Sequence, residues 1–201
     1  AHLAQDVITG RYATRATLPV VGTTVQTFDG TTVWTRDISG GVHPYDSWYP
    51  RARAVTEAYL TRRAYLNPHA RGNVTCVGSA TSEPNGKALV RVEPHGGIPA
   101  VLSIDLLTHL VDSVAVRTPI ATDVTSYADY RQAGPFVLPF SISVASTFEP
   151  ANADRMELTQ YTISRRVNAA DFAKPRAEVN ARMLGGATST TVPIALEGRQ
   201  L

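Results

Sequence analysis

The chain has 201 residues, of which 43% are hydrophobic and 18% are charged, and its formal net charge is +2. This length and composition are typical of one folded domain, or one domain with a tail, and exclude a disordered chain. Because the charge is near neutral and the basic residues form no dense run, nucleic acid and an anionic membrane surface are poor candidate partners. The single cysteine, Cys76, excludes an internal disulfide, and no apolar stretch reaches the ~18 residues of a transmembrane helix.

The first strong strand pattern surrounds Asp29-Gly30. Residues 23–28 and 31–36 are rich in Thr, Val and aromatic side chains, which favour strands. Asp and Gly both tolerate positive φ, so this dipeptide predicts an antiparallel hairpin with a two-residue type I′ turn.

One segment predicts a helix of about four turns. Pro50 has the preset φ of a first helical position, Asp46 or Ser47 can cap it, and Asn67-Pro68 ends it. Four apolar residues then fall near one helical face: Val55, Ala58, Tyr59 and Leu66.

The second half of the chain reads as a series of strands. Turns at Asn85-Gly86 and Gly96-Gly97 predict hairpins of strands over residues 73–81, 87–93 and 98–105. Together with the turn at Asp29-Gly30, these three successive hairpins predict a meander. Two runs alternate apolar and smaller residues at period two: Ile98, Ala100, Leu102 and Ile104, then Phe136, Leu138, Phe140, Ile142 and Val144. Pro99 predicts a sheet edge or a bulge.

Further strands are predicted over residues 110–117, 125–131 and 156–165, and a shorter helix over 176–183, before Gly185-Gly186. The fold class is therefore mainly β (α+β), with at least seven antiparallel strands and one apolar sheet face. One helix cannot cover such a face. The part of the sheet face that the helix leaves uncovered must curl on itself, pack on another domain, or stay open as an apolar groove. An open apolar groove is by default a binding site.

No complete catalytic constellation is present in the sequence. Asp105 and His109 are predicted to be residues of a turn after a strand, and His43 in the loop before the helix has no evident catalytic partner. Asp29-Gly30-Thr31 and Asp37-Ile38-Ser39-Gly40 have the wrong residue order for an aspartic-protease loop. We therefore predict no catalytic residue, no metal site and no cofactor in this chain.

The large apolar residues have two interpretations. They line a lipophilic groove or they belong to the core, and for any single residue the core is the commoner outcome. The groove hypothesis applies to the set, whose predicted ligand-binding members are Trp34, Tyr59, Phe136, Leu138, Phe140 and Ile142.

An ordered set of short blocks resembles the lipoprotein-carrier (LolA-like) domain that precedes retropepsin-like aspartic peptidase domains in some bacterial exported proteins. The blocks are Phe28–Trp34 (FDGTTVW), Ala58–Leu60 (AYL), Gly97–Asp105 (GIPAVLSID), Thr108–Leu110 (THL), Tyr127–Arg131 (YADYR), Leu138–Phe140 (LPF) and Asp171–Pro175 (DFAKP). The resemblance implies a curved, incomplete β-barrel with one or two covering helices over residues 1–175. It also implies an apolar ligand, acyl chain or hydrophobic peptide as partner, and export to the periplasm, although no signal peptide opens the sequence.

The resemblance further implies a linker and lead-in strand over residues 176–201, ahead of a peptidase domain absent from this chain, and a missing N-terminal helix and first strands. Three hypotheses stay open. The chain is a non-catalytic, groove-bearing accessory domain; or a processed propeptide or regulatory part that stays with an aspartic peptidase; or a structural module whose apolar face pairs with a partner sheet.

Overall fold

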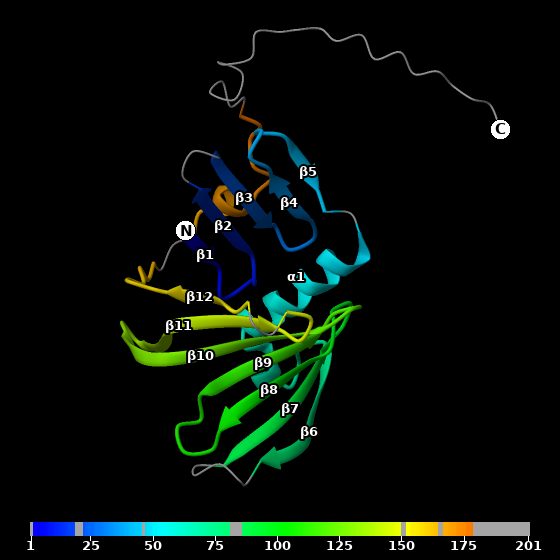
Figure 1. Ribbon diagram of the computed structural model, residues 1–201, viewed down its shortest axis with the longest axis vertical. Helices are drawn as coiled ribbons and strands as arrows, with labels where there is room; N and C mark the ends of the chain where they lie inside the picture. Colours follow the sequence, from blue (N-terminus) through cyan, green and yellow to red (C-terminus); the bar gives the residue numbers. More distant parts are fainter. Residues whose placement is uncertain are drawn as a thin grey trace, which may run out of the picture.

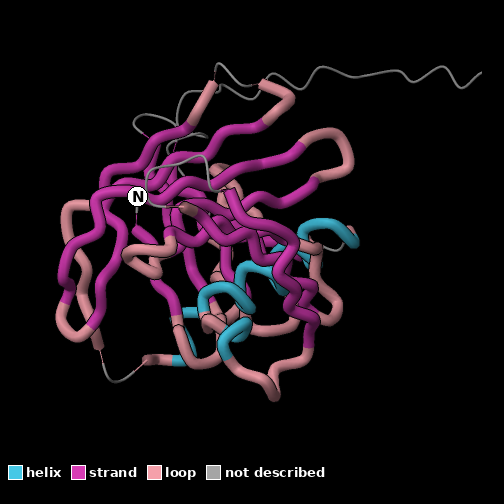
Figure 2. The backbone as a smooth tube through the Cα atoms, turned by 90° about the horizontal axis from the view of Figure 1, so that it is seen from below, coloured by secondary structure: helices cyan, strands magenta, loops and turns pink. Residues whose placement is uncertain are grey.

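A computed structural model describes residues 2–18, 22–45, 47–80, 86–149, 152–164 and 167–178. In this part of the chain, strands β1–β5 form one antiparallel sheet and β6–β12 form another, each in sequence order. The helix α1 lies between the two sheets, and the strands arch around it (Figures 1 and 2). The predicted mainly β architecture is confirmed, with the strands divided over two unclosed sheets.

The five-stranded sheet contains the first predicted hairpin. Its strands are β1 (His2–Gln5), β2 (Tyr12–Leu18), β3 (Gly22–Phe28), β4 (Val33–Arg36) and β5 (Val42–Pro44). The hairpin is confirmed, but the two-residue type I′ turn is wrong, because Phe28 pairs with Val33 and leaves a four-residue loop. The Asp29 carboxylate accepts hydrogen bonds from the backbone N–H of Thr31 and Thr32. Asp29 thus organises the loop with its side chain, while only Gly30 in it has positive φ, at 105°.

Helix α1 (Trp48–Thr61) begins two residues before Pro50, with Ser47 at its N-cap. Pro50 is tolerated in this first turn because the backbone nitrogens there have no partner within the helix. The predicted continuation to Asn67 is wrong: Arg63 adopts a left-handed conformation (φ 50°) and the 3₁₀ turn η1 (Ala64–Leu66) follows. Leu66 therefore leaves the helical face and is 70% exposed. The other predicted cap, Asp46, lies outside the described residues.

The seven-stranded sheet confirms the meander for its second and third hairpins, but the prediction that the Asp29-Gly30 hairpin belongs to the same sheet is wrong, because β3 and β4 lie in the five-stranded sheet. Its strands are β6 (Gly72–Ala80), β7 (Lys87–Pro94), β8 (Ala100–Asp105), β9 (Val111–Arg117), β10 (Thr122–Ala133), β11 (Phe136–Ser146) and β12 (Asp154–Glu157). The turn residue Asn85 lies outside the described residues. The prediction of a sheet edge at Pro99 is wrong, because Pro99 immediately precedes β8 and β8 is internal to the sheet. The alternative, a bulge at Pro99, is also wrong, because the register shift of β8 lies at Ser103/Ile104. The strand predicted over 156–165 ends at Glu157.

Two hydrophobic clusters hold the sheets on opposite sides of α1. Ala54 and Ala58 contact the five-stranded sheet at Tyr12, Phe28 and Val33. On the other side of the helix, Tyr59 and the following Ala64 contact the seven-stranded sheet, at Val92, Ala100, Leu102 and Val114. Because α1 is buried against sheets on two sides, its core residues spread beyond the one face that the sequence predicts.

A hydroxyl group also joins α1 to the seven-stranded sheet. Thr56 is 1% exposed, and its Oγ1 accepts a hydrogen bond from the backbone N–H of Ile98 at 2.7 Å. The same oxygen lies 2.8 Å from the Ile98 carbonyl oxygen and 3.2 Å from that of Ala52, and it donates to one of them. This contact fixes the helix against the segment that leads into β8.

The β1–β2 loop holds the five-stranded sheet against α1. A Cβ atom on Gly10, whose φ is +79°, would lie 2.7 Å from the Cβ of Ala58. Asp6 is buried in this loop; burial opposes its charge, but hydrogen bonds from Thr9, Arg11 and nearby backbone N–H groups hold the pKa of its carboxyl well below the usual range.

Residues 167–178, which include the 3₁₀ turn η2 (Ala169–Phe172), return to the five-stranded sheet. They cover the sheet face opposite α1, where Phe172 is 2% exposed and Thr27 Oγ1 donates to the Ala173 carbonyl at 3.1 Å. The short helix predicted from Arg176 is wrong for residues 176–178, which are not helical, and its remainder lies outside the described residues. The predicted lead-in strand after residue 189 also lies outside them.

Candidate functional site

The seven-stranded sheet extends beyond the cover of α1. Directly opposed residues of antiparallel strands share a face, and Val114, a core residue beneath α1, is opposed by Thr125. The face turned toward α1 therefore continues through Thr125 and Val144, and through the row Tyr127–Ile142–Met156. By the same alternation it includes Phe136, Leu138 and Phe140.

The residues in this extension of the face are only partly covered. Val92 and Leu102, beneath the helix, are 0% and 1% exposed, whereas Phe136 and Met156 are 40% and 43% exposed. Leu138, Phe140, Ile142 and Val144 are half-buried. The β10–β12 end of the sheet thus presents an apolar surface that α1 covers only in part, at β10.

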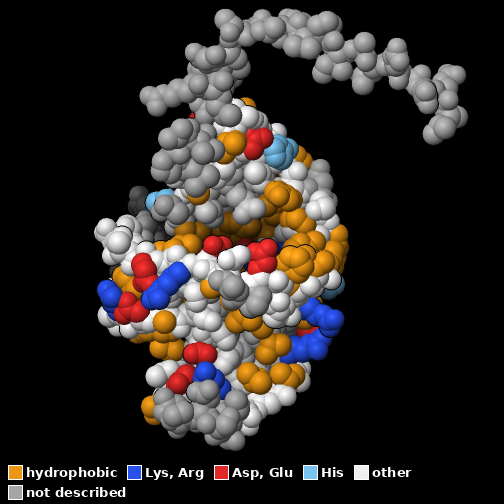
Figure 3. Space-filling view, in the orientation of Figure 1, with side chains coloured by type: hydrophobic (Ala, Val, Ile, Leu, Met, Phe, Trp, Pro, Cys, Tyr) orange, Lys and Arg blue, Asp and Glu red, His pale blue; other side chains and the backbone are white. Residues whose placement is uncertain are grey.

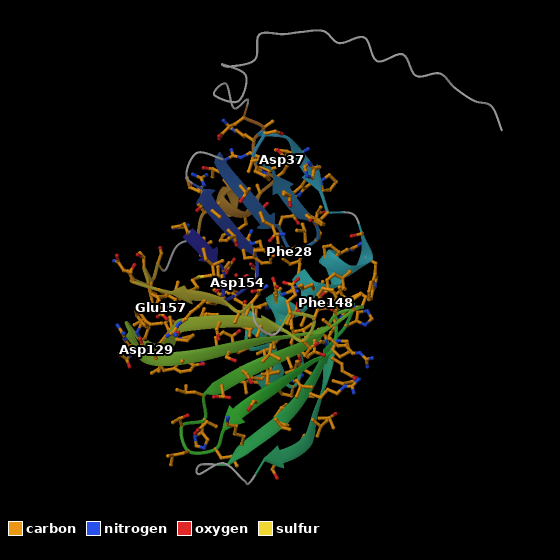
Figure 4. The ribbon with its side chains drawn as sticks, in the orientation of Figure 1. Phe28, Asp37, Asp129, Phe148, Asp154 and Glu157 are labelled. Atoms are coloured by element: carbon orange, nitrogen blue, oxygen red, sulfur yellow. The ribbon has the colours of Figure 1, made fainter. Side chains whose placement is uncertain are left out.

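A hollow of about 220 Å³ adjoins this surface, between the first half of α1 and the five-stranded sheet. It is lined by Tyr12, Gln26, Tyr45, Tyr49, Pro50, Arg53, Ala54 and Glu57. The space-filling view is hollowed between the two sheets, with hydrophobic and acidic side chains around the opening (Figure 3). We call this hollow, together with the α1-facing side of β10–β12, the crevice. Figure 4 shows Phe28 on one side of it, and Asp154 and Phe148 on the other.

Charged side chains bridge the crevice at α1. Arg53 Nε donates to Glu57 Oε1 at 3.1 Å, and Arg53 Nη1 donates to Asp123 Oδ2 of β10 at 2.9 Å. Burial works against the charge of Arg53, but Glu57 and hydrogen bonds to Glu57, Asp123 and Tyr49 raise the pKa of its guanidinium. Arg53 therefore stays protonated and ties the helix to the edge of the apolar surface.

Tyrosines supply further polar atoms in the crevice. Burial, with smaller contributions from Glu57 and neighbouring phenols, raises the pKa of Tyr127 to about 12. Tyr161 donates its hydroxyl hydrogen to the Pro139 carbonyl at 2.6 Å, and its ring meets the Phe140 ring edge-on with centroids 5.1 Å apart. Because neither phenol carries a charge, the sheet side of the crevice stays mainly apolar, and Tyr161 packs against Phe140 of β11.

The structure brings four of the six predicted ligand-binding residues onto one face: Phe136, Leu138, Phe140 and Ile142. Tyr59 lies in the core beneath α1 and is 8% exposed. Trp34 lies on the face of the five-stranded sheet away from α1, where Lys174 Nζ is 4.6 Å from its ring centroid. Tyr59 is therefore kept from the crevice surface by its burial, and Trp34 by the five-stranded sheet.

Sequence reasoning missed the crevice residues Tyr12, Arg53, Tyr127 and Met156. Tyr127 stands in one of the blocks that carry the family resemblance, and this was the available signal. Met156 gives no period-two signal because β12 is only four residues long. Arg53 belongs to the crevice only because Asp123, 70 positions later, folds against it.

The other candidate groups are structural. Asp105 Oδ1 accepts hydrogen bonds from the backbone N–H of Leu107 and Thr108, and His109 has a φ of 58°, which confirms the predicted turn. Asp37 lies at the far end of the five-stranded sheet (Figure 4). In the residues that the structure describes, no three His, Cys, Asp or Glu side chains are placed to hold a metal ion. No helix within those ranges is long and apolar enough to span a membrane.

No family model matches the chain, and no curated protein matches its sequence. A solved structure does match its fold: a putative outer membrane lipoprotein-sorting protein domain from Vibrio parahaemolyticus, with a TM-score of 0.57 and 10% identity. The match covers 87% of this chain and 77% of that domain. The fold is therefore similar to that of a lipoprotein-sorting, LolA-like domain, as the sequence resemblance predicts. The predicted peptidase neighbour has no counterpart in this comparison.

Proposed function

We propose that this chain is a non-catalytic binding domain that holds an apolar ligand, an acyl chain or a hydrophobic peptide, in the crevice. The observation that carries the proposal is the row of large apolar side chains, from Phe136 to Val144 and Met156, that continues past α1 without full cover. Carriage of lipid-modified protein, as the name of the structural neighbour indicates for that domain, supports the choice of ligand. Residence in the periplasm follows as part of the same proposal.

The physical driving force is the burial of apolar area. Each methylene group of a ligand that leaves water contributes about 0.8 kcal/mol. Ile142 and Met156, directly opposite each other on β11 and the edge strand β12, offer such contacts. The phenol group of Tyr127, which lies on the same face, offers a hydrogen bond to an ester or amide of the ligand.

The test combines lipid extraction and mass spectrometry of the purified protein with titration of a fluorescent fatty acid. Saturable binding and co-purified acyl chains are expected. Clean extracts together with non-saturable fluorescence would rule the proposal out, and would favour instead a module whose apolar face pairs with a partner sheet.

A matched pair of variants locates the binding. Met156→Asp places a carboxylate on the crevice side of the sheet and is expected to weaken fatty-acid binding about tenfold or more, because the charge must lose water when the chain binds. Val137→Asp is the control: Val137 has a similar exposure, 40%, but lies on the opposite face of β11. If the two variants bind the fatty acid with equal affinity, the ligand does not lie on the crevice side of β11 and β12.

The proposal extends to the setting of the domain. Residues 1–175 form the binding domain, and residues 176–201 link it to an adjacent aspartic peptidase domain that it serves as accessory, propeptide or regulatory part. The family resemblance of the seven sequence blocks supports this. Reading the parent gene decides it: an Asp-Thr-Gly or Asp-Ser-Gly loop is expected downstream, and a reading frame without one would refute the peptidase association.

A further inference from the structure

The hollow beside α1 differs chemically from the apolar surface next to it. Three tyrosines line it: Tyr12 from β2, Tyr45 from the loop before the helix, and Tyr49 from the first turn of α1. Glu57, a carboxylate that is 45% exposed, also lines it. Aromatic faces combined with a carboxylate form the environment that recognises organic cations in proteins.

Arg53 and the two carboxylates bonded to it carry a net negative charge. Arg53 carries one positive charge, while Glu57 and Asp123, both bonded to it, carry one negative charge each, which leaves a net charge of −1. Two of the three nitrogens of the guanidinium already donate, Nε to Glu57 and Nη1 to Asp123. An anion entering the hollow would meet the Glu57 carboxylate and an arginine that is already paired, whereas a cation would offset the net negative charge of this group.

We infer that this hollow receives an ammonium group of a ligand, primary or quaternary. The positive charge would lie near Glu57, and its methyl or methylene groups against the tyrosine rings. Arg53 serves as a positioning residue, because it holds the Glu57 carboxylate while Asp123 offsets its charge. Asp123 is also on the α1-facing side of β10, so a chain attached to the ammonium group would continue along Tyr127 and Ile142. Only this last step depends on the proposed function; the ammonium site itself does not.

The test compares choline with 3,3-dimethylbutan-1-ol, which has the same shape but no charge. Titration of the full chain, followed by NMR or calorimetry, is expected to show choline binding about tenfold more tightly, in line with the strength of cation–π and ion-pair contacts. Glu57→Gln is expected to remove most of that difference. Tyr45→Leu, at a 46% exposed position that tolerates change, is expected to weaken choline binding several-fold.

Glu93→Gln is the matched control. Glu93 is also a partly exposed glutamate paired with an arginine, Arg91, but it lines a separate hollow with Arg71 and His95. Its variant is expected to bind choline as the unmodified protein does. Equal binding of choline and its uncharged analogue, or an unchanged preference in a folded Glu57→Gln variant, would overturn the inference.

A third probe separates a lipid from a free amine. Dodecyltrimethylammonium below its micelle concentration should bind more tightly than choline if the ammonium group belongs to a lipid, and equally tightly if the ligand is a free amine; both results keep the ammonium site. Failure of fatty-acid binding with choline binding intact would refute the proposed function alone. Loss of the choline preference with fatty-acid binding intact would refute the ammonium site alone.

Discussion

Replacing Thr56 by valine tests how α1 is held on the seven-stranded sheet. The side chain is buried, and its Oγ1 satisfies the N–H of Ile98 at 2.7 Å while lying 2.8 Å from the carbonyl oxygen of the same residue. Valine nearly reproduces the shape of threonine but can make neither bond. Ile98 is 6% exposed, so water cannot replace the lost partner.

The expected loss of stability follows from those two groups. Leaving a buried polar group unsatisfied costs about 1–3 kcal/mol, so for two groups we expect Thr56→Val to lower the free energy of unfolding by about 2–6 kcal/mol. For a chain of this length, each kcal/mol corresponds to a fall of about 2–4 °C in Tm. Thr56→Ser keeps the hydroxyl and should cost about 1 kcal/mol for the missing methyl group.

Urea unfolding followed by circular dichroism provides the measurement. Thr61→Val is the control, because Thr61 is half-buried at the end of the same helix and no side-chain hydrogen bond is found for it among the described residues. The control should stay within about 0.5 kcal/mol of the unmodified protein. If Thr56→Val also changes the free energy of unfolding by less than about 0.5 kcal/mol, the hydrogen bonds to Ile98 do not hold the helix. Equal losses of stability in Thr56→Ser and Thr56→Val would lead to the same conclusion.

Three further predictions concern the packing and titration of the fold. Gly10→Ala should lower the free energy of unfolding by about 3 kcal/mol, because φ is positive there and a Cβ would lie 2.7 Å from Ala58. Gly96→Ala has a similar φ but no heavy atom within 4 Å, so it should cost only about 1 kcal/mol. Equal losses of stability in urea unfolding would refute the close contact. The pKa of Asp6 is lower in the folded than in the unfolded state, so its contribution to stability is present at neutral pH and lost as the pH falls below about 4. Asp6→Asn should therefore flatten the fall of Tm with decreasing pH in that range. An unchanged slope of Tm against pH would contradict this. The pKa of Tyr127 is raised to about 12, so its contribution to stability is complete below pH 10 and lost as the pH rises toward 12. Tyr127→Phe should lessen this loss of stability at alkaline pH. In a pH titration followed by absorbance at 295 nm, the variant should show one fewer phenol that ionises late.

The local features of this fold could be predicted because neighbouring residues decide them. Asp29, Gly86 and Gly96 predict where the chain reverses, and antiparallel hairpins form at all three places. The period-two pattern predicts which residues of β8 and β11 share a face, since a strand turns its side chains alternately to either side.

The same local signals misplace elements whose ends depend on packing. The apolar pattern extends α1 to Leu66, yet the chain turns at Arg63, so that Ala64 packs in the core and Leu66 is exposed. Helix α1 itself gives a weak pattern because it is buried on two sides.

For the candidate site, the residue pattern predicts the apolar row from Phe136 to Ile142 and a number of strands that one helix cannot cover. This pattern leaves three outcomes open for the uncovered face: it curls on itself, packs on another domain or stays open. Long-range packing divided the strands into two sheets around α1. It also placed Trp34 on the far face beneath residues 167–178, and brought Arg53 against Asp123. These outcomes rest on contacts between residues far apart in the chain, and such contacts leave no periodic signal in the sequence around either partner.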